Sequence, residues 1–482
     1  MEIVLKSSER PLVEALTKFK DTNPISFHVP GHKHGMLSGL PSELRGALQY
    51  DFTELKGLDD LHEPNGVIEE AQQKLSTLYG SDRSFFLVNG TTVGNLAMVY
   101  ATCRAGDTVI VQRNAHKSIF HAIELTGARP VFVSPVWDEA TKTAGTVRSA
   151  QVNKALQTFP EAKAVILTYP TYYGITGSEL EETIRLCHMN GVPVLVDEAH
   201  GAHFVVGEPF PRSALEMGAD IVVQSAHKTL PAMTMGSYLH MRTNYISPEK
   251  VASYLGMLQS SSPSYLLMAS LDDARAFAES FSKEDKVKFM EQRGTFIKQL
   301  NLIPRLQTIQ TDDPLKLILR IEGCSGFDLQ KRLETVGIYG ELADPYQVLF
   351  VLPLLKAELS YPFAETCNRI QTAVAGLTVT ESAEHIDDVS PVEKELSRLA
   401  YTSDEMAHME VEWIPYKESV NRVAAVSITP YPPGIPLFIR GEIVSEAHIQ
   451  SLDILLQMGA KFQGPIRIED KQIIVVKNRA EE

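Results

Sequence analysis

The sequence has few cysteines and no paired cysteine motif. Four cysteines occur in 482 residues, at widely separated positions (Cys103, Cys187, Cys324 and Cys367), and none belongs to a CxxC pair. This pattern excludes a disulfide scaffold and a cysteine-based metal site. We expect reduced thiols in a cytoplasmic protein, and no metal ligand set.

The chain also lacks an excess of positive charge and any long hydrophobic run. Lysine and arginine total 45 against 60 acidic residues, for a net charge of -15. Nucleic acid is therefore not an expected partner, because phosphate binding requires a basic face. The first 20 residues, MEIVLKSSERPLVEALTKFK, are charged early, so neither a signal peptide nor a membrane span is expected. A cationic substrate suits this acidity, which also favours solubility.

What the chain does contain is enough apolar sequence for two domains. It is 44% apolar, and its length exceeds one ordinary core. Residues 11–20 predict a short amphipathic helix, followed by an ordered arm, NPISFHVPGHKHG, rich in proline and glycine. We expect an N-terminal arm and helix over 1–65, a large domain over 66–305 and a smaller α+β domain over 306–482.

Helices alternate with short, almost wholly apolar strands from about Gly66 onward. The expected helices are 66–80, a segment ending at 103, 116–126 and 178–190, and the expected strands are 108–112, 130–134, 164–168, 192–196 and 219–224. This alternation predicts an α/β fold with a mostly parallel sheet and chemistry at the carboxyl ends of its strands. Further on we expect strands at 316–322 and 347–353, a helix at 326–337, and a solvated surface segment at 376–410.

Two charged residues stand at the ends of consecutive predicted strands. Asp197 ends VPVLVD, and Lys228 follows ADIVVQSAH. Burying a carboxylate or a lysine without a partner costs free energy, so a partner that compensates the charge is expected for each residue. Pyridoxal 5'-phosphate (PLP) supplies a partner for both, since a carboxylate can keep its ring nitrogen protonated while a lysine amine condenses with its aldehyde. The alternative is an aspartate that caps a loop and a lysine at a strand exit.

Two segments could bind a phosphate. In SAHK, Ser225 and His227 precede Lys228, so a hydroxyl and an imidazole could reach phosphate oxygens. In FFLVNGTTVGN, a strand, a glycine turn and a helix start place the amides and hydroxyls of Gly90, Thr91 and Thr92 where they could grip a phosphate. A plain helix N-cap is the alternative explanation of the second segment.

Two histidines are further candidates. His116 opens a helix directly after strand TVIVQ, where its flat imidazole could stack on a cofactor ring. His200 comes three residues after Asp197 and could handle protons near Lys228 or contact a substrate carboxylate. A surface histidine at a helix end and a packing histidine are the respective alternatives.

Eight ordered blocks of the sequence resemble the bacterial ornithine/lysine/arginine decarboxylases of fold type I, nearly from end to end. The blocks are FHVPGHKHG (27–35), LDDLHEPNGVIEEAQ (58–72), VNGTTVGN (88–95), RNAHKS (113–118), TYPTYYG (168–174), DEAHGAHF (197–204), SAHKTLPAMTMGSYLH (225–240) and SSSPSYLLMASLD (260–272). The resemblance implies a PLP-dependent transferase-like large domain followed by a smaller α+β C-terminal domain.

The same resemblance implies roles for individual residues. It makes Lys228 the cofactor lysine and Asp197 the partner of the pyridine nitrogen, stacks His116 on the ring, and places the following residues around the phosphate: Gly90, Thr91, Thr92, Ser225 and His227. It also implies that Ser262 approaches the cofactor phosphate of a partner subunit. The expected assembly is therefore a homodimer or a larger oligomer built from dimers.

Some features depart from the family pattern. The large enterobacterial members begin with a receiver-like domain that this shorter chain lacks, and they carry a tryptophan where this chain has His200. Near the C-terminus, PYPPGIPLFIRGE (430–442) has Arg440 where the family usually has proline. In this block Glu442 could meet a cationic side chain of the substrate.

The expected reaction is decarboxylation of arginine, lysine or ornithine, which yields CO2 and a polyamine-type amine. Two alternatives stay open. An aminotransferase or another PLP lyase would keep Lys228 and Asp197 and break a different bond at Cα, although no local pattern singles out an arginine clamp for the substrate carboxylate. A relative without catalytic activity would bind PLP or a partner protein as a regulator.

Overall fold

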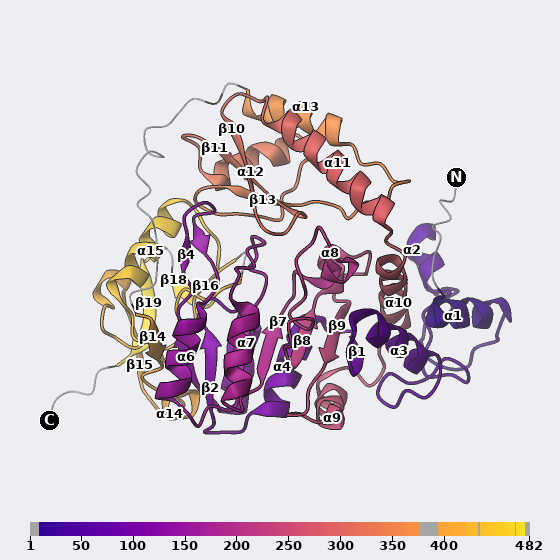
Figure 1. The fold of residues 1–482 in the computed structure, drawn as a ribbon, viewed down its shortest axis with the longest axis horizontal. Coiled ribbons are helices and arrows are strands. Elements are labelled where there is room, and N and C mark those ends of the chain that lie inside the picture. Colours follow the sequence, from indigo (N-terminus) through magenta and orange to yellow (C-terminus); the bar gives the residue numbers. More distant parts are fainter. Residues whose placement is uncertain (1–8, 376, 378–393, 432–433, 468, 478–482) are drawn as a thin grey trace. The chain divides into compact units, whose positions relative to one another are not determined.

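The computed structural model describes residues 9–375, 377, 394–431, 434–467 and 469–477. The chain forms two compact units, each built from two segments; Figure 1 labels their helices and strands. Unit 1 comprises Met1–Thr102 and Pro193–Ser282, and unit 2 comprises Cys103–Val192 and Lys283–Glu482. The domain boundaries at 65/66 and 305/306 stay predictions.

Unit 1 contains four strands in the order β1-β9-β8-β7, with bounds β1 (Arg83–Leu87), β7 (Val194–Asp197), β8 (Ile221–Gln224) and β9 (Ser237–Met241). β7 and β8 are parallel, and β9 is antiparallel to both β8 and β1. Three of the four strands therefore point the same way. Nearly all of their residues are buried, which explains the apolar runs of β7 and β8, whereas β1 and β9 also contain buried polar residues such as Ser84 and His240.

The helices of unit 1 include an N-terminal helix anchored by a buried carboxylate. They are α1 (Pro11–Asp21), α2 (Ser42–Ala47), α3 (Val67–Tyr79), α4 (Gly90–Thr102), η1 (Ala202–Val206), α8 (Ala226–Thr229), α9 (Pro248–Leu258) and α10 (Tyr265–Glu279). The backbone N–H of Leu12 donates to Asp272 of α10 at 3.0 Å. A Cβ on Gly94 would lie 2.5 Å from Val223, so glycine is what lets α4 lie close to β8.

Unit 2 contains strands in the order β6-β2-β3-β14, with bounds β2 (Thr108–Gln112), β3 (Arg129–Val133), β6 (Val165–Thr168) and β14 (Leu396–Arg398). β2 is parallel to both β3 and β6, whereas β14 is antiparallel to β3. The helices of this segment are α5 (Lys117–Thr126), α6 (Ser149–Thr158) and α7 (Leu180–Met189), and β4 (Trp137–Asp138) pairs with β5 (Thr143–Ala144). β2, β3, β6, α5 and α7 lie within a few residues of the predicted elements, whereas α6 was not predicted.

β14 corrects the expectation that 376–410 is only a solvated surface segment. Residues 396–398 pair with β3 at the edge of the strand run, and nearby Met406 is buried in α14 (Ser403–Met406). The strand escaped notice because an edge strand can stay polar, as Ser397 and Arg398 do. Residues 376 and 378–393 lie outside the described part of the chain.

The rest of unit 2 is α+β, as predicted. A four-stranded antiparallel sheet has the order β10-β11-β13-β12, with bounds β10 (Leu306–Gln310), β11 (Lys316–Ile321), β12 (Leu342–Ala343) and β13 (Val348–Val351). It shares an apolar core with α11 (Lys283–Leu300), α12 (Gly326–Thr335) and α13 (Phe363–Val374) (Figure 1).

A last small core lies near the C-terminus. Its elements are β15 (Val411–Pro415), η3 (Tyr416–Glu418), β16 (Thr429–Pro430), α15 (Glu446–Gln457), β17 (Phe462–Gln463), β18 (Ile466–Arg467) and β19 (Gln472–Val476). Among the helices in the described ranges, none combines the length and apolar character that crossing a bilayer demands. The protein thus has the predicted fold class: α/β with mostly parallel strands, followed by a smaller α+β part.

Candidate functional site

Polar residues collect in unit 1 where the neighbouring parallel strands β7 and β8 end. Asp197 is the last residue of β7, and Ser225 follows the last residue of β8. The backbone N–H of Glu198 donates to Val223 O at 2.9 Å, so the pairing continues past the end of β7. The carboxyl ends of the two strands therefore present their side chains at one edge, as the sequence predicts.

Asp197 is a buried hydrogen-bond acceptor, only 2% exposed. Asn95 Nδ2 of α4 donates to its Oδ2 at 2.9 Å, and the backbone N–H of Ala199 donates to its Oδ1 at 3.2 Å. Burial raises the pKa of Asp197, and the charge of Lys228 together with these two bonds acts in the opposite direction. A buried carboxylate held in this way is suited to a cationic partner.

Lys228 lies beside His200. It belongs to the short helix α8, and its backbone N–H donates to Ser225 O at 3.1 Å. Its Nζ is 3.0 Å from Nε2 of His200, a side chain that is buried. A protonated amine can donate to a neutral imidazole at this distance. The structure thus brings the lysine, the histidine and the aspartate of the sequence prediction into one neighbourhood.

The candidate phosphate-binding residues considered first come from two segments of unit 1: the start of α4 and the residue that follows β8. Thr91 Oγ1 and Ser225 Oγ lie 3.1 Å apart, so the two segments singled out from the sequence meet through their hydroxyls. Thr92 is exposed in the first turn of α4, where backbone amides have no partner within the helix. Gly90 has φ of +72° and donates its amide to Met235 O at 2.9 Å, so it forms the turn.

Two other predicted residues of unit 1 occupy different settings. His227 is half-buried, and its Nδ1 lies 3.0 Å from the backbone oxygen of Gly236. Ser262 is exposed on the loop before α10, and its backbone N–H donates to Ser260 Oγ at 3.2 Å. An exposed Ser262 is compatible with the role at a partner subunit that the resemblance implies.

His116 belongs to unit 2 and caps α5. Its Nδ1 lies 2.8 Å from Ser118 Oγ and accepts the backbone N–H of Ser118 at 3.3 Å. The loop at Gly434 passes close to the ring, since a Cβ on that glycine would lie 3.1 Å from His116 Nε2. Lys117 also donates its backbone N–H to Gly434 O at 3.1 Å. The ring is therefore held in place by its own helix and by this loop.

Two buried residues of unit 1 had no role in the sequence interpretation. Asn95, fully buried, lies one turn after Thr91 on α4 and holds Asp197. Glu198, also fully buried, accepts hydrogen bonds from Ala214 N at 2.6 Å and Gln224 Nε2 at 2.7 Å. Asn95 gave a sequence signal, as a polar residue within an apolar helix, whereas Glu198 follows the charged Asp197 and gave no signal of its own.

Burial makes Glu198 a neutral acid at pH 7, raising its pKa from 4.5 to about 8. Tyr79 of α3 lies within the electrostatic influence of Glu198, Gln224 links Glu198 to His240 of β9, and Asp197 adjoins it in the sequence. Burial raises the pKa of Tyr79 and lowers that of His240 to about 3, so both are also neutral at pH 7. The charge of Lys228, by contrast, stabilises the ionised form of Asp197.

This raised pKa predicts a specific dependence of stability on pH. Between pH 4.5 and about 8, Glu198 is ionised in the unfolded chain but protonated in the folded one. Its contribution to the free energy of unfolding is therefore full below pH 4.5 and is lost as pH rises to about 8, by about 1 kcal/mol per pH unit. In Glu198→Gln this decline disappears, which urea unfolding across this range measures.

The exposed Glu70→Gln variant is the control, and its free energy of unfolding should follow that of the wild type at every pH. A difference in free energy of unfolding between wild type and Glu198→Gln that does not change with pH would contradict the assignment.

Glu442 has a protein cation as its partner. In unit 2, Arg113 makes a two-pronged contact with it, from Nε at 3.0 Å and from Nη2 at 2.7 Å. The backbone N–H of Ile439 adds a third bond at 3.1 Å. Glu442 is 7% exposed, so this ion pair is largely closed to solvent. The carboxylate thus links the C-terminal block to the residue that follows β2. The contact with substrate suggested by the sequence stays a prediction.

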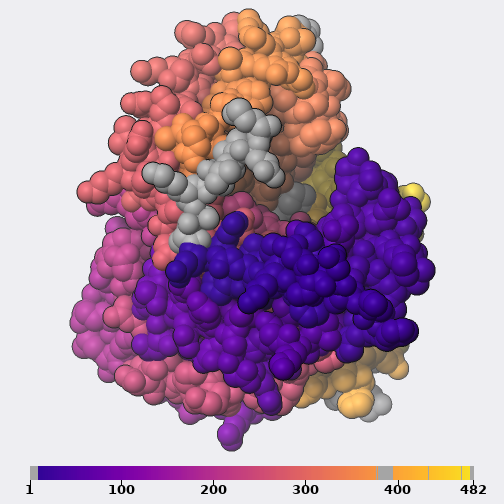
Figure 2. All heavy atoms as spheres, turned by 90° about the vertical axis from the view of Figure 1, so that its right-hand side faces the viewer, coloured from indigo at the N-terminus to yellow at the C-terminus, as the bar shows by residue number. Residues whose placement is uncertain are grey.

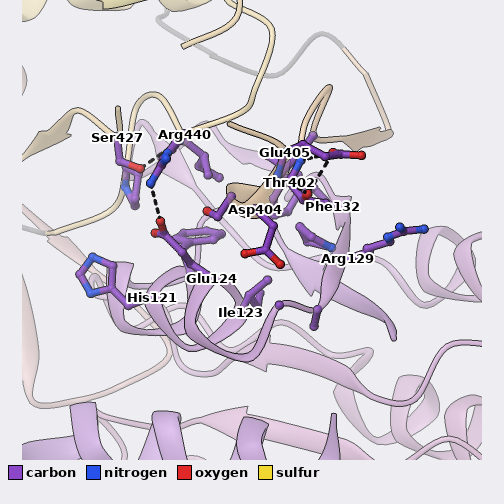
Figure 3. Close-up of a pocket in the computed structure, with 18 of the residues that line it drawn as sticks. His121, Ile123, Glu124, Arg129, Phe132, Thr402, Asp404, Glu405, Ser427 and Arg440 are labelled. Carbon is purple, nitrogen blue, oxygen red and sulfur yellow. Dashed lines mark hydrogen bonds and ion pairs between the residues drawn. The ribbon is translucent and has the colours of Figure 1, made fainter. Parts of the chain in front are cut away.

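A cavity of about 250 Å³ also lies in unit 2, along α5 and at the amino end of β3 (Figure 3). Phe120 and Phe132 contribute to its apolar wall, and Arg440 bonds Glu124 across it at 2.9 Å. Arg440, which stands where the family usually has proline, thus forms an ion pair with Glu124 in this structure. Of the candidate site residues, none lines this cavity.

Comparisons with known families and proteins match almost the whole chain. Residues 10–312 match the family described as Orn/Lys/Arg decarboxylase, major domain, and residues 389–465 match its C-terminal domain. The uncharacterised protein YaaO of Bacillus subtilis (strain 168) is 47% identical, over 96% of this chain and 98% of YaaO. The arginine decarboxylase of the same organism is 34% identical, over 98% of each chain.

Solved structures support the fold. The lysine decarboxylase LdcF of Francisella novicida superimposes with a TM-score of 0.78 at 21% identity, over 97% of this chain and 81% of LdcF. A structure of SPT with PLP matches with a TM-score of 0.52 at 16% identity, over 76% of this chain and 84% of that one. At such identities the likeness concerns the architecture alone.

Proposed function

The chain belongs to the Orn/Lys/Arg decarboxylase family, and we propose that it is a PLP-dependent decarboxylase that converts a basic amino acid into CO2 and a polyamine-type amine. One observation carries the proposal: the buried carboxylate of Asp197, held by Asn95, lies within the electrostatic influence of Lys228 at the carboxyl ends of two parallel strands.

The residues at this edge fit the chemical groups of PLP. Asp197 offers a buried acceptor for the protonated pyridine nitrogen, and Lys228 offers an amine for the aldehyde. Thr91 and Ser225 present two hydroxyls 3.1 Å apart, which suit phosphate oxygens. We propose that Thr92, His227 and the turn at Gly90 complete the phosphate site, and that His116 stacks on the cofactor ring.

PLP supplies an electron-withdrawing ring that accepts the electron pair released at Cα when CO2 leaves. Asp197 keeps a proton on the pyridine nitrogen, while Asn95 and the Ala199 amide fix the direction of its carboxylate. His200 Nε2 lies 3.0 Å from Lys228 Nζ, so with an unprotonated Nε2 it can take the proton that the amine must lose before acting as a nucleophile. Lys228 Nζ can afterwards deliver a proton to Cα.

A basic amino acid is the proposed substrate, and arginine or lysine is favoured over ornithine. The matched relatives include proteins named as arginine and lysine decarboxylases. A pocket that ends in an acidic group rejects neutral side chains strongly, whereas one methylene changes binding by only about 1 to 3 kcal/mol. Side-chain length is therefore the weaker determinant of specificity.

We propose that the enzyme works as a homodimer, with Ser262 of one copy near the cofactor phosphate of the other. The N-terminal arm supports this assembly because it exposes large apolar side chains: Ile25 (88%), Phe27 (96%), Met36 (77%) and Leu37 (68%). Figure 2 shows the N-terminal part of the chain, in indigo, on the molecular surface. Such a concentration of exposed apolar side chains is typical of a protein interface.

A single substitution in the arm tests the dimer. We expect Phe27→Asp to raise the dimer dissociation constant by about tenfold or more, because a charge replaces an apolar contact. Light scattering after size-exclusion chromatography over a dilution series measures it. Val287→Asp, which changes an exposed apolar residue of α11, is the control and should leave the dimer intact. A wild-type protein that is monomeric at every concentration would rule the assembly out.

A cytoplasmic location completes the proposal. All four cysteines carry thiols in the structure, and three of them are buried. Reduced thiols are the usual state of cysteines in the cytoplasm.

Absorbance of the bound cofactor separates this function from its alternatives. A decarboxylase shifts its PLP absorbance when a basic amino acid is added and then releases CO2. An aminotransferase shifts the absorbance but forms a keto acid without CO2, and a regulator without catalytic activity forms neither product. Keto acid or no product from arginine, lysine and ornithine would refute the proposal.

A further inference from the structure

The DEAHGAHF segment contains a buried group that the proposed chemistry does not use. Glu198 is fully buried directly after Asp197, and its side chain contacts other elements than Asp197 does. Asp197 bonds to Asn95 of α4, whereas Glu198 accepts bonds from Gln224 and from Ser213 and Ala214 in the loop after η1. Adjacent residues of an extended chain point to opposite faces, as these partners require.

The same alternation holds at the end of β8. Ser225 contacts Thr91 of α4, on the side where Asp197 meets Asn95, and Gln224 turns away from it. Glu198 and Gln224 are thus the neighbours in sequence of the two cofactor candidates, and they bond directly to each other at 2.7 Å. Their bond ties the end of β7 to the end of β8 on the face opposite Asp197 and Ser225.

A directed chain of hydrogen bonds ends on Glu198. Ser84 Oγ lies 2.7 Å from Nδ1 of His240, and Nε2 of His240 lies 3.2 Å from Oε1 of Gln224. The imidazole of His240 is neutral, so it accepts from Ser84 and donates to Gln224, whose amide then donates to Glu198. The chain crosses β1, β9 and β8 before it reaches the end of β7. A satisfied buried network of this kind makes a core rigid.

Gly201 shows how tightly Glu198 is enclosed. A Cβ on Gly201 would lie 2.6 Å from Glu198 Cγ and 2.9 Å from its Oε1. The backbone N–H of Gly201 also donates to Glu198 O at 2.9 Å. A side chain at Gly201 would therefore collide with Glu198, so this position of the DEAHG sequence requires glycine.

We propose that Glu198 is a positioning residue, which through Gln224 sets the spacing between the pyridine-nitrogen anchor Asp197 and the phosphate anchor Ser225. This role rests on the proposed function, because it presumes that PLP binds at these two residues. Glu198 itself touches neither cofactor nor substrate. Its protonated state at pH 7 keeps a second negative charge away from Asp197.

The test compares PLP binding with stability in four variants of the full chain. Glu198→Ala removes the centre of the network, and Gln224→Met cuts the bond to Glu198 with little change in volume. Glu198→Gln keeps a neutral group of the same shape. Ser84→Ala, the control, breaks the network at its far end on β1. The readouts are the dissociation constant of PLP, the circular dichroism of the bound cofactor and the melting temperature without PLP.

We expect Glu198→Ala and Gln224→Met to raise the PLP dissociation constant by about tenfold, the equivalent of one lost buried hydrogen bond, and to weaken the cofactor dichroism. Glu198→Gln should bind PLP within about twofold of wild type, as expected for a neutral carboxyl group. Ser84→Ala should lower the melting temperature without changing PLP affinity. If Glu198→Ala fails to fold, Gln224→Met carries the comparison.

Two results would overturn the role of Glu198 while leaving the proposed function intact. One is wild-type PLP affinity and dichroism in both Glu198→Ala and Gln224→Met. The other is an equal loss of PLP affinity in Ser84→Ala, which would mean that the network contributes only general stability. If the wild-type protein binds no PLP at all, the proposed function itself fails, and the positioning role with it.

Discussion

Lys228→Ala should release no measurable CO2 from any basic amino acid, a loss of at least about 10³-fold in kcat/KM. The reason is that the variant lacks both the amine that holds the cofactor aldehyde and the group that returns a proton to Cα. The measurement is CO2 release under saturating PLP. Borohydride reduction followed by peptide mass spectrometry should find PLP on the peptide that contains Lys228 in wild type and on no peptide in the variant.

The control for this experiment is Lys250→Ala. Lys250 is an exposed lysine on α9 of the same unit, and its side chain has no part in the proposed chemistry. It should retain full activity and normal cofactor attachment. Persistent decarboxylation by Lys228→Ala, or PLP trapped on another lysine of the wild type, would remove Lys228 from the centre of the mechanism.

Asp197→Asn should lower kcat by about 10²- to 10³-fold while PLP stays attached to Lys228. Asparagine has the same shape and can still accept the hydrogen bond of Asn95, but it carries no charge to keep the pyridine nitrogen protonated. The ring then withdraws electrons less strongly, so the step that releases CO2 slows. Single-turnover CO2 release and the absorbance of the attached cofactor measure the two effects separately.

Asn95→Ala is the companion variant, since it leaves the charge of Asp197 and removes only one of its hydrogen bonds. We expect a smaller loss of kcat, about tenfold, because the carboxylate is misdirected but still ionised. If Asp197→Asn and Asn95→Ala lose equal activity, or if Asp197→Asn loses none, the charge is not what matters at this position.

The sequence predicted the candidate site best where the regular geometry of the backbone determines where a residue lies. Parallel strands end at one edge, and this rule alone predicts that Asp197 and Ser225, each next to a short apolar run, come together. The glycine turn at the start of α4 carried similar information, because a positive φ at Gly90 is a local requirement. Predictions of these residues needed no knowledge of tertiary packing.

The residues that escaped the sequence interpretation depend on tertiary contacts. Asn95 looks like any polar residue in a helix until α4 lies against β8, which the missing Cβ of Gly94 permits. Glu198 follows Asp197 in the sequence, yet its partners come from positions 15 to 26 residues later in the chain. The ion pair of Glu442 escaped the sequence interpretation for the same reason, because its partner Arg113 is 329 residues away.

The most direct test of the central claim is to incubate the wild-type protein and PLP with arginine, lysine and ornithine in turn, and to measure CO2 and the corresponding amine in the same samples. The proposed function predicts equal molar amounts of CO2 and amine from at least one of the three. Consumption of amino acid without CO2, or no consumption by protein that has bound PLP, would contradict it.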